Sequence, residues 1–351
     1  MAIEEKWYDG KYYNATKLIN TEEFTPEQYW GIAGSSLNIK RSPPSLLDAM
    51  SEKIFPGSIS RFRLLNQTSS VDAFEEEMVA RIAASTLLTK KQLIDYMKLC
   101  GLLAPISDSL IESWIIERRL KKLLDLQLLE QVTLTYSSGK SDHKAFRITE
   151  LGQQMARKKG VRIHKGNMYQ SPEKRAKTGL LDTPTQIMRM LVANNIALRF
   201  LNDSNNIERF EFMTTLHMKG EITLHTITRS ALSVIKEDGS TVLYEVFRRP
   251  DPLHQTTEDL RNYDKYIKDK IRRYFELVQR ADFLEKNSLS LKAIPKLAIV
   301  AEDPSHLDEL EKLLTPFIKR HRVDERADVI FICDYGLDSG IIYNPKYPKI
   351  E

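Results

Sequence analysis

The sequence predicts an α+β fold for the first half of the chain and an α/β fold with a mixed sheet for the second half. Three observations lead to this prediction. Apolar residues recur at helical spacing between residues 71 and 125, the period changes to two between 131 and 149, and helix and strand patterns alternate from about residue 182. A chain of 351 residues can hold two or three domains, each with its own core.

Three helices are expected first. VDAFEEEMVARIAAST has an acidic first turn and a periodic apolar set, namely Val71, Phe74, Met78, Val79 and Ile82. TKKQLIDYMKL starts at a Thr cap and ends before Gly101. SDSLIESWIIERRLKKLLDLQLLE opens with Ser and Asp, and its buried stripe is predicted to be Ile111, Ile115, Leu120, Leu123 and Leu124.

A hairpin and a closing helix follow these three helices. QVTLTY and KAFRIT alternate with period two around the polar turn SSGKSDH, and TELGQQMARKKG then returns to helix. This order of elements is typical of a winged helix-turn-helix, here predicted at residues 71–160. Such a domain lays its third helix in the DNA major groove and its wing against the backbone.

Basic residues occur where this motif would contact DNA. We predict ten of them as contacts: Arg118, Arg119, Lys121 and Lys122 in the third helix, Lys140, Lys144 and Arg147 in the wing, and Arg157, Lys158 and Lys159 after it. The alternative is a protein-interaction module of the same shape, in which the basic patch is a solvated face.

Two flanking segments complete the first half. Residues 1–70 are rich in aromatic residues and are expected to dock on the rest of the chain or on a second subunit. Residues 161–181 form a basic linker, which either contacts phosphates, making binding salt-dependent, or is simply solvated.

Residues 182–351 are predicted to form the α/β domain. DTPTQIMRMLVANNIALRFLND is expected to be a helix, and three strand-like stretches follow it, the last two joined by the hairpin signal Asp238–Gly239. The charged helix TTEDLRNYDKYIKDKIRRYFELVQR, the buried strand IPKLAIVAED, the helix SHLDELEKLLTPFIKRH and the strand ADVIFICDY complete the domain.

This order resembles the core of the PD-(D/E)xK nucleases, whose carboxylates hold Mg²⁺ beside a lysine. By that resemblance Asp238 and Glu245 are the candidate acids, with Glu208 or Glu211 from the preceding helix as a further one. Phe247 stands where the lysine belongs, and Arg248 and Arg249 follow it. Because arginine cannot carry protons as lysine can, we expect a degenerate, non-catalytic domain without a metal or other cofactor; Mg²⁺ would be needed only if the site were active.

Composition limits the other classes of function. The formal net charge is +4, so the chain is not basic in the manner of a histone. Cys100 and Cys333 lie far apart in apolar surroundings, which indicates core residues in a reducing cytoplasm. No secretory signal and no apolar run long enough for a bilayer are visible, so we expect a cytoplasmic protein that makes no membrane contact.

Several short motifs together resemble the replication-relaxation family of Gram-positive plasmids, phages and integrative elements. These are RITELG at 147–152, EDG at 237–239, YEV at 244–246 and a helix with Leu260, Lys265 and Tyr266, and the resemblance spans about residues 71–335. The family joins a winged helix to a nuclease-like domain. Its members often carry an acid at the position of Phe247, where this chain departs from the pattern. The resemblance implies work on the DNA of a mobile element.

The sequence therefore predicts a sequence-specific, double-stranded-DNA-binding protein of a plasmid or phage, acting in transcriptional regulation or in initiation of replication or transfer. We expect a homodimer, because one winged helix buries little surface. Two alternatives remain open: a metal-dependent endonuclease or nickase using Asp238 and Glu245, and a non-catalytic scaffold or sensor that binds protein.

Overall fold

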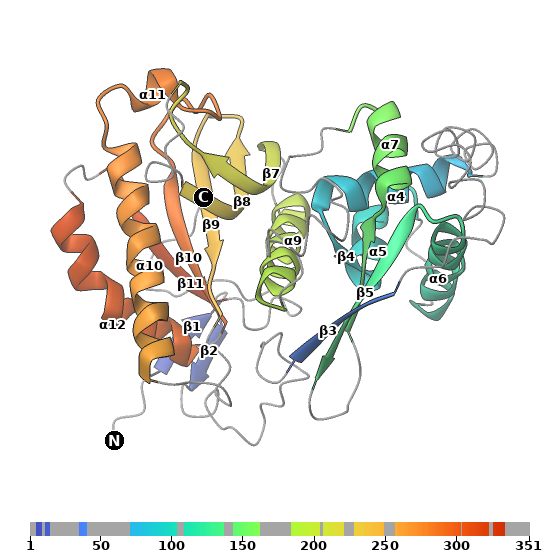
Figure 1. The fold of residues 1–351 in the computed structure, drawn as a ribbon, viewed down its shortest axis with the longest axis horizontal. Coiled ribbons are helices and arrows are strands. Elements are labelled where there is room, and N and C mark those ends of the chain that lie inside the picture. The colour runs from blue at the N-terminus through green and yellow to red at the C-terminus, as the bar shows by residue number, and fades with distance from the viewer. Residues whose placement is uncertain are drawn as a thin grey trace, which may run out of the picture. The chain divides into compact units, whose positions relative to one another are not determined.

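The computed structural model describes residues 5–8, 11–14, 35–40, 71–103, 109–136, 143–161, 184–203, 206–220, 228–248, 257–302, 304–322 and 326–333. The protein is a mixed α+β chain that divides into two compact units (Figure 1). Unit 2 comprises Ser36–Thr135 and Ser141–Asn194, and unit 1 comprises Asn195–Glu351 together with Met1–Ser35 and Tyr136–Lys140.

Side-chain caps mark the starts of three helices of unit 2. Helix α4 (Ala73–Ser85) starts after Asp72, which forms a reciprocal capping box with Glu75. Helix α5 (Lys90–Leu99) starts after Thr89, which forms a second such box with Gln92. Helices α6 (Ser109–Asp125) and α7 (Glu150–Lys158) follow, and the hydroxyl of Thr149 caps α7 by accepting from the Gly152 amide. The predicted helices of residues 71–160 are thus all present.

A four-stranded sheet in the order β3-β5-β6-β4 accompanies these helices. Strands β5 (Leu129–Tyr136) and β6 (His143–Ile148) form the predicted hairpin, with Leu129 opposite Ile148. Two strands were not predicted. Strand β4 (Leu88–Thr89) pairs with β6 and is too short to show a period, and β3 (Ser35–Lys40) comes from the aromatic N-terminal segment.

Helix α9 (Pro184–Asp203) begins in unit 2, whereas the sequence analysis assigned all of it to the C-terminal domain. The side-chain amide of Gln92 donates to the carbonyl of Leu191 at 2.7 Å. The fully buried Asn194 amide donates to the carbonyls of Ser85 (3.1 Å) and Leu87 (2.9 Å). These two carbonyls flank the end of α4, so Asn194 ties the first half of α9 to the rest of unit 2.

Unit 1 contains a five-stranded mixed sheet in the order β11-β10-β9-β8-β7. Strands β7 (Ile207–Leu216), β8 (Thr228–Lys236) and β9 (Thr241–Val246) form an antiparallel meander, and β10 (Lys296–Ala301) and β11 (Val329–Cys333) continue parallel to β9. The mixed sheet is as predicted. Strand β7 begins at Ile207, earlier than the sequence pattern suggested, so Glu208 and Glu211 lie on a strand and not on a helix.

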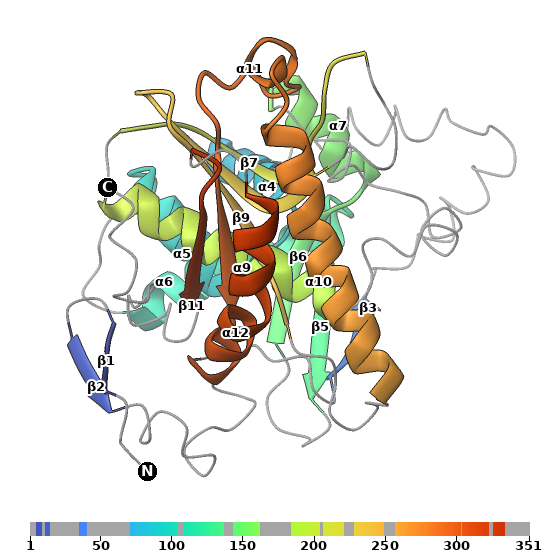
Figure 2. The ribbon, with the colours of Figure 1, turned by 90° about the vertical axis from the view of Figure 1, so that its left-hand side faces the viewer.

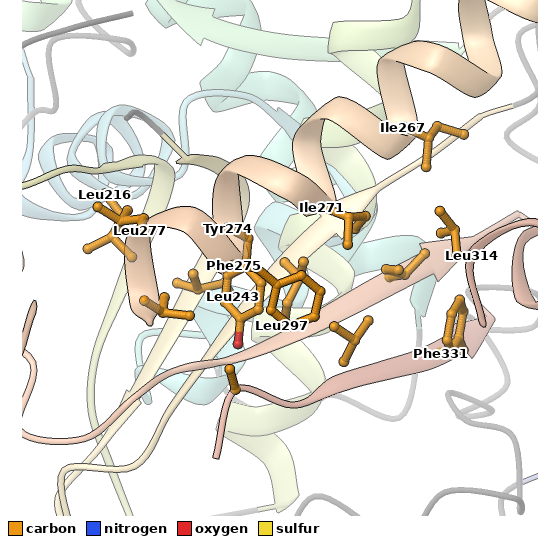
Figure 3. Close-up of a cluster of buried hydrophobic side chains, with 14 of the residues drawn as sticks. Leu216, Leu243, Ile267, Ile271, Tyr274, Phe275, Leu277, Leu297, Leu314 and Phe331 are labelled. Carbon is orange, nitrogen blue, oxygen red and sulfur yellow. The ribbon is translucent and has the colours of Figure 1, made fainter. Parts of the chain in front are cut away.

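Helices α10 (Thr257–Val278) and α12 (Pro304–His321) lie against one face of this sheet, in contact with each other (Figures 1 and 2). Each connects two neighbouring parallel strands, as a crossover connection requires. Their apolar stripes meet alternate residues of the strands in one core, where Ile271 and Phe275 of α10 lie over Leu243 and Leu297 (Figure 3). The second half of α9 contacts the opposite face, where the ring of Phe200 meets that of Tyr244 edge-on, at 6.0 Å between centroids.

The remaining described elements are small. Strands β1 (Glu5–Tyr8) and β2 (Lys11–Asn14) form a hairpin in the N-terminal segment, and the short helix α11 (Phe283–Lys286) follows α10. Cys333 lies in the core as expected, whereas Cys100 is only half-buried; both are free thiols. The predicted basic linker at 161–181 lies outside the described residues except for its first residue.

Candidate nucleic-acid interface

Helix α6 presents one face to the interior of unit 2 and one face to solvent. Ile116, Leu120 and Leu123 are buried at spacings of four and three residues. The predicted stripe was displaced by one residue at its start, since Ile116 and not Ile115 is fully buried. The opposite side, which we call the outward face of α6, consists of the exposed residues Trp114, Arg118, Lys121 and Asp125.

Two of the predicted DNA contacts in α6 instead face the start of α4. Arg119 forms an ion pair with Asp72 and lies 3.4 Å from Glu75, and Lys122 contacts Glu75 at 2.7 Å. The Arg119 guanidinium also stacks over the ring of Phe74, 4.6 Å from its centroid. Because residues 119 and 122 border the buried stripe, their side chains are directed toward the neighbouring helix. They stabilise the packing of α6 on α4.

The groups around Asp72, at the start of α4, shift the pKa of its carboxyl group. Burial is the largest single effect on Asp72 and favours its neutral form. Hydrogen bonds from Arg119 and from the Glu75 amide act together in the opposite direction, so the pKa of Asp72 is lowered from its ordinary value of 3.8. The carboxylate is therefore held ionised between the helix N-terminus and the guanidinium.

Two more of the predicted contacts pair with acids of the protein. Arg147 is buried and forms an ion pair with Glu130, which lies directly opposite it in the β5–β6 ladder. Lys159 lies 2.9 Å from Glu76 of α4. Arg147 is therefore buried and paired within the protein, whereas a contact with the DNA backbone would need an exposed side chain.

The other predicted contacts stay accessible. Arg118, Lys121, Lys144, Arg157 and Lys158 are exposed, as is Lys159 despite its ion pair, whereas Lys140 lies outside the described residues. Arg118 and Lys121 are neighbours on the outward face of α6, one turn apart. Of the four basic residues predicted in the third helix, these two are exposed, and Arg119 and Lys122 are half-buried.

An aromatic residue that the sequence pattern did not single out, Trp114, lies on the same face. The side chain of Trp114 is 61% exposed, and the Arg118 guanidinium carbon lies 5.7 Å from its ring centroid. A correct phase for the buried stripe would have revealed it, since position 114 lies opposite Ile116 and Leu120 on a helical projection. Trp114 and Arg118 together form a flat, cationic surface of the kind that contacts nucleotides.

The two candidate nuclease acids are not brought together. Asp238 is exposed in the β8–β9 turn, where it accepts a hydrogen bond from the Ser240 amide at 2.7 Å. That hydrogen bonding to Ser240 is the main cause of the lowered pKa of Asp238, so the carboxylate serves the turn. Glu245 is buried four residues beyond the start of β9 at Thr241, about 13 Å along the strand at ~3.3 Å per residue.

Glu245 pairs instead with a lysine of helix α10. Its carboxylate forms an ion pair with Lys270, whose ammonium lies 5.1 Å from the ring centroid of Tyr266 and 5.8 Å from that of Phe247. Sequence spacing could not reveal this pair, because its members are separated by the whole crossover from β9 into α10. Among the described residues, no group of three or more His, Cys, Asp or Glu side chains could hold a metal ion.

The two further candidate acids, Glu208 and Glu211 of β7, form ion pairs with a neighbouring residue of the same strand. Arg209 contacts Glu211 at 3.1 Å and forms a second ion pair with Glu208. Glu211 stands opposite Ser233 of β8, which in turn stands opposite Leu243 of β9, so Glu211 lies two strands away from Glu245. At ~4.8 Å between neighbouring strands, this separation exceeds the reach of a shared metal ion.

A second polar cluster lies at the carboxyl ends of β9 and β10. The imidazole of the buried His306 accepts at Nδ1 from the backbone amide of Glu302 (3.3 Å), and its Nε2 lies 3.0 Å from the Tyr263 hydroxyl. This pairing assigns the proton of the neutral ring to Nε2. The cluster therefore fastens the start of α12 to α10 within unit 1.

No protein family model, curated protein or solved structure matches this chain. None of the helices in the described parts of the chain combines the length and apolar character that a bilayer crossing needs.

Proposed function

We propose that residues 71–160 form a winged helix-turn-helix domain that binds double-stranded DNA in a sequence-specific manner. The order of α4, β4, α5, α6, β5, β6 and α7 and the pairing of β4 with β6 support this proposal. In such a domain α6 would occupy the major groove and the β5–β6 hairpin would approach the backbone.

The observation that carries the proposal is the outward face of α6. Arg119 and Lys122 are held by acids of α4, yet Arg118 and Lys121 stay exposed and one turn apart. Exposed cations at this spacing can meet successive phosphates or base edges, whereas the paired cations give the helix a fixed orientation. Lys144 of β6 and Lys158 of α7 are exposed cations of the same unit.

The proposal includes a biological role on a mobile genetic element. The motifs shared with the replication-relaxation family favour regulation, or initiation of replication or transfer, on a plasmid or phage. A homodimer would double the buried surface and would require a target site with two-fold symmetry. The protein would act in the cytoplasm and without catalysis of its own.

Affinity selection tests the proposal. The purified full chain is mixed with sheared DNA from its source at physiological salt, and the retained fragments are sequenced. We expect one shared motif with approximate two-fold symmetry, beside a promoter or an origin. Uniform recovery of all fragments would contradict sequence-specific binding.

Paired variants then locate the interface. Replacing Arg118 and Lys121 together by alanine should weaken binding of the selected duplex and lower the salt dependence of binding by about two phosphate contacts. The matched control replaces Lys319 and Arg320, two exposed cations of α12, and should leave affinity unchanged. Equal affinity of both variants would instead favour a scaffold whose helical unit binds protein.

A further inference from the structure

Trp114 is the most exposed large hydrophobic side chain in the described part of the chain, at 61% of its surface. Most apolar residues of α6 lie in the core or at its border, so this exposure is specific to the outward face. Leaving an indole in water forgoes a large hydrophobic gain, and aromatic residues of this type are energetic anchors when a partner covers them.

The neighbours of Trp114 indicate the chemistry of that partner. The Arg118 guanidinium lies over the indole, and Lys121 follows on the same face. A nucleotide presents a flat base next to a negatively charged phosphate, so an aromatic ring beside a guanidinium complements both parts of it at once.

The charge of this face is low for a helix that binds only phosphates. Glu117 is exposed and lies 3.1 Å from Lys90, and Asp125 ends the outward face. The cations Lys90, Arg118 and Lys121 outnumber the acids Glu117 and Asp125 by one, and this small surplus supplies little net attraction to a duplex. A contribution that does not depend on charge is therefore needed, and the indole can supply it by stacking.

Paired bases offer little to an indole. In a duplex each base is covered by its neighbours, and the groove edges are distinguished by patterns of donors and acceptors, whereas tryptophan has a single donor. An unpaired base, in contrast, exposes its whole face, and stacking on an aromatic side chain tolerates any sequence.

We propose that Trp114 stacks on an unpaired base, so that a DNA site with a locally opened segment is bound more tightly than the same site fully paired. This inference rests on the proposed DNA-binding function and refines its substrate. Arg118 orients the indole and contacts the adjacent phosphate, and Lys121 contacts the next one. Such a preference suits a protein that acts where strands are opened.

Fluorescence provides a direct test, because the other two tryptophans are Trp7 and Trp30. In a variant with both replaced by phenylalanine, the emission comes from Trp114 alone. We expect binding of a single strand, or of a duplex with a central unpaired bubble, to quench this emission strongly, and the fully paired duplex of the same sequence to quench it little.

Affinity measurements with the full chain complete the test. Trp114→Ala should weaken binding of the bubble and single-stranded probes about tenfold or more and binding of the paired duplex by less than about threefold. Trp114→Phe should keep most of the affinity, because it keeps a ring, and Leu284→Ala, which removes another exposed apolar side chain, should keep all of it.

The outcomes separate this inference from the proposed function. An equal loss on all probes, or no loss, would overturn the stacking role of Trp114 while leaving DNA binding by Arg118 and Lys121 intact. If the unmodified protein bound none of the probes, the proposed function itself would fail, and the inference with it.

Discussion

Breaking the ion pair between Glu245 and Lys270 should destabilise unit 1 in an asymmetric way. The Glu245 side chain is 3% exposed and that of Lys270 is 18% exposed. Lys270→Met leaves a carboxylate buried without its cation, which costs about 3–5 kcal/mol in comparable sites. Glu245→Leu should cost less, about 1–2 kcal/mol, because the long lysine side chain can extend toward solvent.

The double variant Glu245→Leu/Lys270→Met completes a double-mutant cycle with the two single variants. It removes both charges and replaces them with apolar groups of similar volume, so it should recover much of the loss caused by Lys270→Met alone. The assay is hydrogen exchange of the β9 and β10 amides, which reports the opening free energy of this sheet without contributions from unit 2. Additive losses would refute the argument that the two side chains neutralise each other.

The same variants test the nuclease alternative. If Glu245 held a catalytic metal ion, any Mg²⁺-dependent cleavage of DNA would disappear in the double variant. If the pair is structural, DNA affinity and the absence or presence of cleavage should be unchanged once stability is recovered. A lost cleavage activity with a stable fold would contradict the structural role assigned here.

Three further predictions concern unit 2. Asn194→Ala should lower its free energy of unfolding by about 2–3 kcal/mol, because the carbonyls of Ser85 and Leu87 each lose a buried donor. Urea denaturation followed by Trp114 emission, in the variant whose Trp7 and Trp30 are phenylalanine, measures this loss, and a value below about 0.5 kcal/mol would contradict it. Gly152→Ala should cost about 1–3 kcal/mol, since the added Cβ would lie 2.1 Å from the Leu128 carbonyl oxygen, whereas Gln154→Ala should be nearly neutral. Because the pKa of Asp72 is lowered from 3.8, its contribution is fully present above about pH 4 and is lost as pH falls further. Asp72→Asn should lower the free energy of unfolding by less than about 1 kcal/mol at neutral pH, because the site is half-exposed. This difference from wild type should shrink as the pH is lowered, and a difference that stays constant would contradict the assignment.

Local signals carried the correct parts of the sequence analysis. The Thr89 cap marked the start of α5, the acidic first turn marked that of α4, and Asp238–Gly239 marked the β8–β9 turn. Such signals act over three or four residues, so they can be read without knowing the tertiary fold. The alternation of the hairpin and the continuous apolar strands β10 and β11 are local in the same sense.

Ion pairing could not be read in this way. Arg119 is separated from Asp72 by 47 residues and Lys270 from Glu245 by 25, so no spacing rule connects them. Composition therefore presented all basic residues of α6 as equivalent. Helix packing separates these residues into paired and exposed ones, because successive side chains of a helix point in directions about 100° apart.

The amino-acid pattern alone was enough to predict the order of the main helices and strands, the α+β character of the chain and the basic nature of α6. The three-dimensional fold was needed to learn which charges are neutralised, that the first half of α9 belongs to unit 2, and that Trp114 faces solvent. The two groups of features differ in how far apart in the chain the interacting residues lie. Backbone preferences and caps are satisfied by neighbours in the chain, whereas the burial and pairing of a side chain depend on elements that folding brings from far away.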